Sequence, residues 1–87
     1  MDNKQTPTKP TYRVYLRWPA GRVSDKTVTQ SPERALAAFR KLIHLKELRG
    51  EKVGAALTQD GEQRYYCRFD AKPGERGYLP EDAELEL

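Results

Sequence analysis

The segment SPERALAAFRKLIHLKELRG, residues 31–50, restricts the fold more than any other part of the chain. Ser31 is a favourable N-cap, Pro32 suits the first helical position, and Gly50 fits the position after a helix end. Between them, apolar side chains recur at helical spacing, at Ala35, Leu36, Phe39, Leu42 and Ile43. The segment therefore predicts one amphipathic helix with a single apolar side to bury.

The segments before and after this helix alternate as half-buried strands do. Residues 12–18 and 23–30 are joined by the turn sequence PAGR, and residues 53–58 and 62–70 are joined by QDGE. Each pair predicts an antiparallel hairpin.

The register of the second hairpin depends on the length of its loop. A two-residue turn at Asp60 and Gly61 would set apolar residues opposite charged ones. A three-residue loop over 59–61 pairs Ala55 with Tyr65 and brings the apolar residues together, so we expect the longer loop.

The predicted element order is ββαββ. It corresponds to an α+β fold, an antiparallel sheet of about four strands with one helix packed on one face. We expect residues 1–11 to form a flexible N-terminal arm, 12–70 a single α+β domain, and 71–87 a loop and an acidic C-terminal tail. One helix covers only one side of a sheet, so the other side must face water or a partner.

Composition excludes several classes of function. The 87 residues provide one domain, and the single Cys67, expected to be buried, permits neither an intramolecular disulfide nor a cysteine-based zinc site. The only histidine, His44, has no second histidine and no nucleophile–base pair to work with. We therefore expect no enzyme, no catalytic residues, no metal and no cofactor. With no long apolar run and no signal peptide, we expect no membrane partner and a cytoplasmic location.

The uncovered side of the sheet is where the sequence suggests function. Alternation in YRVYLRW and in RYYCRFD places an Arg-Tyr-Arg row on that side of two different strands. Arginine binds phosphates and tyrosine stacks on unpaired bases, although both also cover solvated faces well. The candidate binding residues are Arg13, Tyr15, Arg17, Arg64, Tyr66 and Arg68.

Charge is distributed unevenly along the chain. Residues 1–70 contain fourteen Lys and Arg against eight Asp and Glu, whereas residues 71–87 contain two against five. This asymmetry suggests an anionic partner for the body of the protein. The acidic tail either provides solubilising charge or folds back over the basic face.

Two stretches, YRVYLRWPAGRVSDKTVT and VGAALTQDGEQRYYCRFD, resemble small uncharacterised accessory proteins encoded on conjugative and integrative elements of proteobacteria. The resemblance covers residues 12–70 and assigns no site. It implies an accessory protein of mobile DNA, and such elements also carry anti-CRISPR proteins, which are often small α/β proteins.

These observations support three hypotheses. The first is a non-catalytic module that binds an anionic partner, with single-stranded nucleic acid as the first candidate. The second is a protein-binding inhibitor or assembly factor that acts on an acidic protein surface with its basic face, or through its acidic tail. The third is a structural homodimer without a ligand.

Overall fold

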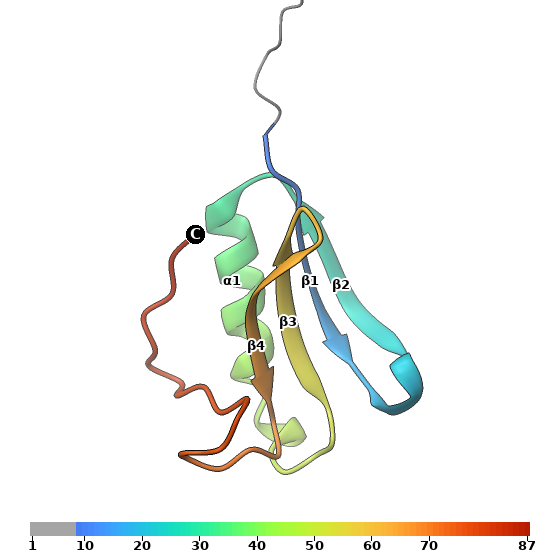
Figure 1. Cartoon of the computed structure of the whole chain (residues 1–87), viewed down its shortest axis with the longest axis vertical. Coiled ribbons are helices and arrows are strands. Elements are labelled where there is room, and N and C mark those ends of the chain that lie inside the picture. Colours follow the sequence, from blue (N-terminus) through green and yellow to red (C-terminus); the bar gives the residue numbers. More distant parts are fainter. Residues whose placement is uncertain (1–8) are drawn as a thin grey trace, which may run out of the picture.

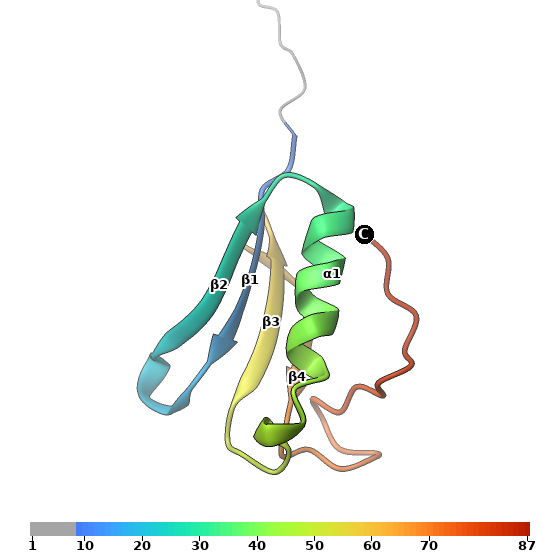
Figure 2. The same cartoon turned by 180° about the vertical axis from the view of Figure 1, so that it is seen from behind.

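The computed structural model describes residues 9–87, and residues 1–8 of the predicted arm lie outside the described part. Its strands are β1 (Tyr12–Arg17), β2 (Val23–Thr29), β3 (Gly54–Gln59) and β4 (Glu62–Arg68), and its helix is α1 (Pro32–Ile43). The four strands form one antiparallel sheet in the order β2-β1-β3-β4, and α1 lies along one side of it (Figures 1 and 2). The predicted α+β fold is confirmed.

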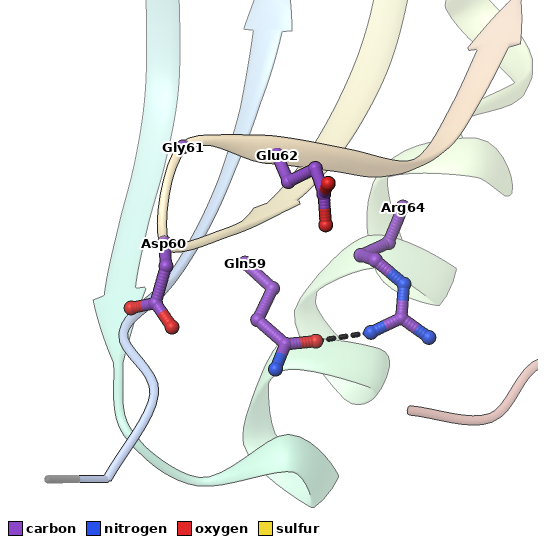
Figure 3. Close-up of a pocket in the computed structure, with 5 residues that line it drawn as sticks. All are labelled: Gln59, Asp60, Gly61, Glu62 and Arg64. Atoms are coloured by element: carbon purple, nitrogen blue, oxygen red, sulfur yellow. Dashed lines mark hydrogen bonds between the residues drawn. The ribbon is translucent and has the colours of Figure 1, made fainter.

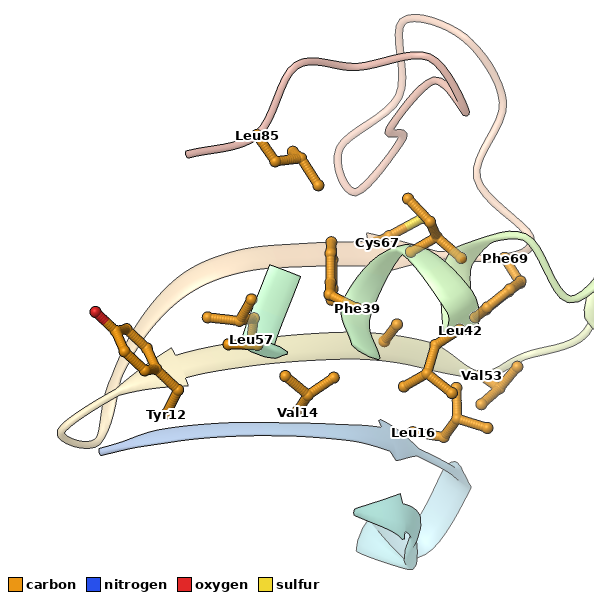
Figure 4. Packing of buried hydrophobic residues seen from close by; sticks show 13 residues of the cluster. Tyr12, Val14, Leu16, Phe39, Leu42, Val53, Leu57, Cys67, Phe69 and Leu85 are labelled. Carbon is orange, nitrogen blue, oxygen red and sulfur yellow. The ribbon is translucent and has the colours of Figure 1, made fainter. Parts of the chain in front are cut away.

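Helix α1 begins as the sequence predicts. The Ser31 side chain accepts a hydrogen bond from the backbone N–H of Arg34 at 3.2 Å, and Pro32 occupies the first turn. The apolar residues of the helix meet the sheet, with Phe39 and Ala35 fully buried. Side chains from β1, β3 and β4 complete this core (Figure 4).

The prediction that Gly50 ends the helix is wrong. The helix stops at Ile43, and Leu45 has an extended backbone, which lets Leu45 and Leu48 pack at the edge of the core. Twelve helical residues span about 18 Å, close to the length of the six- and seven-residue strands below. Gly50 instead adopts its positive φ of 82° in the loop before β3, where its N–H donates to the Phe69 carbonyl.

The loop of the second hairpin also differs from the prediction. Asp60 and Gly61 form a two-residue turn with φ of 52° and 84°, and Gln59 pairs with Glu62. One residue farther on, a β-bulge shifts the register, so that Leu57 pairs with Tyr65 and Ala55 with Cys67. The apolar residues do share one face, but the extra residue that brings them together lies in β4 and not in the turn.

The C-terminal segment, residues 71–87, contributes to the core although it contains no helix or strand. Leu85 is 8% exposed and reaches the cluster beside α1 and β4, where Leu79, Ala83 and Leu87 are partly buried (Figure 4). The segment runs alongside α1 (Figures 1 and 2). Within residues 9–87, no helix has the length and apolar character needed to cross a membrane.

Candidate functional site

The face of the sheet turned away from α1, which we call the open face, receives the first Arg-Tyr-Arg row. Tyr12, Val14 and Leu16 of β1 are buried in the core. Because side chains alternate along a strand, the intervening residues of β1 point the other way. Arg13 and Arg17 are exposed there, and Tyr15 is half-buried.

The second row is separated from the first by one strand. Strand β3 lies between β1 and β4, and it contributes only Gly54, Ala56 and Thr58 to the open face. The cross-strand register then aligns the two rows: Ala56 pairs with both Tyr15 and Tyr66, and Gly54 pairs with both Arg17 and Arg68.

The small residues of β3 are covered by these neighbours. Ala56 is 1% exposed although it points away from the helix. A Cβ atom placed on Gly54 would lie 2.5 Å from the Tyr66 hydroxyl oxygen and 2.7 Å from Cζ of the same ring. Tyr66 therefore leans across β3 and rests directly on Gly54, on the side where β1 carries Arg17. Sequence alternation places Tyr66 on this face but does not reveal the contact, for which a glycine inside a strand is the only signal.

Arg64 does not join the second row. It is the extra residue of the β4 bulge, and its guanidinium donates a hydrogen bond to the Gln59 side chain (Figure 3). Gln59 pairs in register with Tyr12, whose side chain belongs to the core side of the sheet. The bulge thus takes Arg64 out of the alternation that holds for Tyr66 and Arg68.

Arg68 is on the open face but already has a partner. Its Nε and Nη2 donate to the two carboxylate oxygens of Asp70 at 3.0 and 2.8 Å. These hydrogen bonds and the arginine charge hold the pKa of Asp70 below its ordinary value, and Asp70 raises the pKa of Arg68 in return. The pair is solvent-accessible, with 43% and 26% of the two side chains exposed.

The strongest concentration of positive charge on the open face lies over β1 and β2. A shallow hollow there is lined by Arg13, Tyr15, Arg17, Gly21, Val23 and Lys26. Lys26 shares the open face with Val28, two residues along β2, which pairs with Arg13; beyond Lys26 a second bulge, at Asp25 with φ of 54°, shifts the β1–β2 register. The sequence prediction did not include Lys26, because the pattern of residues 23–30 predicts a strand without assigning its two faces. Among residues 9–87, no carboxylate forms an ion pair with Arg13, Arg17 or Lys26.

Apolar side chains flank this hollow on the edge strand. Val23 and Val28 of β2 are 46% and 55% exposed, and they pair in register with Arg17 and Arg13. The open face is therefore basic and aromatic at its centre, with an apolar border along β2.

The acidic C-terminal segment lies on the opposite side of the sheet, beside the helix. Arg49 forms an ion pair with Glu81, and Arg40 donates to the Ala83 carbonyl at 3.3 Å. Near the end of the segment, the Tyr65 hydroxyl donates to the Glu86 carbonyl and accepts from the Glu86 N–H, both at 3.0 Å. These contacts hold residues 81–87 on the helix side of the sheet, whereas Gly77, earlier in the segment, accepts the Arg68 N–H at 2.7 Å.

The cysteine and the histidine of the chain have structural surroundings. Cys67 is 6% exposed, and burial raises the pKa of its thiol. His44 lies at the end of α1, where its Nε2 is 3.1 Å from the Glu81 carbonyl oxygen. In the described part of the chain, no group of His, Cys, Asp and Glu side chains is arranged to hold a metal ion.

Comparison of the chain with known protein families, with curated protein sequences and with solved structures finds no match. The resemblance to mobile-element proteins stays a prediction, and the open face is the feature of the structure that indicates a function.

Proposed function

We propose that this protein is a small, non-catalytic cytoplasmic module that binds an anionic partner on its open face, with single-stranded nucleic acid as the first candidate. Its predicted origin in mobile DNA belongs to the same proposal. The observation that carries it is the alignment of Tyr15 and Tyr66 beside the cationic hollow of Arg13, Arg17 and Lys26. Guanidinium groups pair with phosphates, and tyrosine rings stack on bases that are not already paired.

The charge of the open face supports an anionic ligand. Among residues 9–87, Asp70 is the carboxylate that pairs with a candidate binding residue, and that residue is Arg68. The acidic C-terminal segment is held beside α1 and leaves the hollow accessible. Binding to phosphates releases counterions, so affinity should fall with salt by a slope of about 0.7 per phosphate for a single strand.

Fluorescence anisotropy of a labelled single-stranded oligonucleotide at two salt concentrations tests this proposal. The wild-type protein should bind in a salt-sensitive manner, and the double variant Arg13→Glu/Arg17→Glu should lose most of the affinity. The matched control is Arg34→Glu/Lys41→Glu, which changes the net charge equally but on exposed positions of α1. Equal loss in both variants, or no binding by the wild type at low salt, would reject a nucleic-acid site on the open face.

A protein partner is the second candidate, and the apolar border of the open face favours it. Exposed Val23 and Val28 beside Arg17 and Arg13 give the mixture of apolar and arginine side chains that is common in protein interfaces. An inhibitor or assembly factor of this kind would bind an acidic protein surface. Val28→Lys should abolish binding to such a protein while preserving salt-sensitive binding to an oligonucleotide. Light scattering on the same samples would reveal a homodimer.

A further inference from the structure

We infer that the open face contains a two-part nucleotide site, in which an unpaired base stacks on Tyr66 and the neighbouring phosphates occupy the hollow of Arg13, Arg17 and Lys26. Gly54 is the positioning residue that lets the Tyr66 ring lie across the sheet. This inference rests on the proposed function and assigns separate roles to the two parts of the surface.

The Tyr66 ring lies in a position that favours stacking. Tyr66 pairs in register with Ala56, yet its hydroxyl end rests on Gly54 in the neighbouring row. The ring thus leans along β4 and over β3, where a side chain at residue 54 would collide with it at 2.5–2.7 Å. Because Tyr66 is only half-buried, part of the ring remains accessible to a ligand.

The Tyr66 ring also lies close to positive charge. Gly54 pairs directly with Arg17 of β1, so the end of the Tyr66 ring lies beside the hollow. Register partners in antiparallel strands have Cα atoms about 4.5–5.5 Å apart. A ligand seated on the ring therefore has a phosphate-binding group within reach on the same face.

A base can stack on the Tyr66 ring only if it is unpaired. Bases in a duplex are stacked on one another and are not available to a ring on an exposed sheet, whereas single strands can turn a base outward. The site should therefore prefer single strands to duplexes, and it should distinguish a strand with bases from one without them.

The test compares an oligothymidine with an oligonucleotide of the same length whose bases are replaced by abasic sites. Since stacking on an aromatic side chain contributes about 1–3 kcal/mol per base, wild type should bind the oligothymidine about 5- to 150-fold more tightly. Tyr66→Leu should remove this preference and leave the affinity for the abasic strand unchanged. Gly54→Ala should weaken it, since the new methyl group displaces the ring.

Two controls make the result specific. Tyr66→Phe retains the ring and should retain the preference, and Tyr78→Leu removes an exposed tyrosine of the C-terminal segment and should have no effect. Equal wild-type affinity for both strands would overturn the two-part site while leaving the proposed function intact. Loss of affinity for the abasic strand in Tyr66→Leu would also overturn it. Absence of binding to either strand would reject both proposals.

Discussion

Asp70 places a carboxylate beside the open face, where it neutralises Arg68 through two hydrogen bonds. Asp70→Asn should free this guanidinium for a phosphate. We expect the affinity for a single-stranded oligonucleotide to rise about 2- to 5-fold at low salt, with a salt slope steeper by about 0.7. Anisotropy titrations at several salt concentrations measure both quantities. An unchanged slope would show that Arg68 lies outside the bound strand.

The same carboxylate predicts a pH dependence of stability. Arg68 lowers the pKa of Asp70 in the folded state, so the ionised carboxylate stabilises the folded protein. This contribution to the free energy of unfolding is complete above the unfolded-state pKa of about 3.9, and it is lost as the pH falls through the lower pKa of the folded state. Urea unfolding of wild type and Asp70→Asn at a series of acidic pH values measures the difference. The free energies of unfolding of the two proteins should converge toward low pH. A difference that stays constant with pH would indicate that the Arg68–Asp70 ion pair does not cause the difference in stability.

At the scale of the elements, the start of α1 depends on a single side chain. Ser31 satisfies the N–H of Arg34, which has no partner inside the helix at that position. Ser31→Ala should lower the free energy of unfolding by about 1 kcal/mol, whereas Ser31→Asn, which also caps well, should lower it much less. Urea denaturation measures both variants. Equal losses would mean that the cap contributes through something other than its hydrogen bond.

The elements themselves could be predicted from the sequence because each carries a local signal. The cap at Ser31, the apolar stripe through Phe39 and the turn residues Asp60 and Gly61 act within a few positions of themselves. The end of α1 could not be predicted in this way. It depends on the length of the sheet below and on where Leu45 and Leu48 can pack, and both are tertiary properties.

The candidate site was predictable only where its strands are regular. Strand β1 keeps strict alternation against β3, and Arg13, Tyr15 and Arg17 lie on the open face as expected. Bulges interrupt the alternation in the other strands: one takes Arg64 toward Gln59, and another, at Asp25, shifts the register of β2 beside the hollow. A bulge shifts every later side chain to the opposite face, and its position depends on cross-strand packing that a linear pattern does not contain.

At the scale of the whole molecule, the uneven charge of the chain corresponds to two separate surfaces. The acidic C-terminal segment lies along α1, where Arg40 and Arg49 hold it, and the sheet residues Arg13, Arg17 and Arg68 face the other way. A single helix packs against β1, β2 and β3, and the segment covers the core beside β4 with Leu79 and Leu85. Its role in the structure is therefore to close the core, and it leaves the hollow over β1 and β2 uncovered.

This arrangement predicts that stability and binding respond separately to changes in the C-terminal segment. Leu85→Ala removes a side chain that is 92% buried in the core cluster, and it should lower the free energy of unfolding by about 2–3 kcal/mol. That is a large share of the roughly 3–5 kcal/mol expected for so small a domain. Glu84→Gln, at an exposed position next to it, should have almost no effect on unfolding.

Oligonucleotide binding by the folded fraction should be the same in Leu85→Ala, Glu84→Gln and wild type, because residues 81–87 are held on the helix side of the sheet. Urea unfolding combined with anisotropy, under conditions where each variant remains folded, measures both properties on the same preparations. Stronger binding by Leu85→Ala would mean that the segment competes with the ligand for the open face. An unchanged unfolding midpoint would mean that Leu85 does not belong to the core.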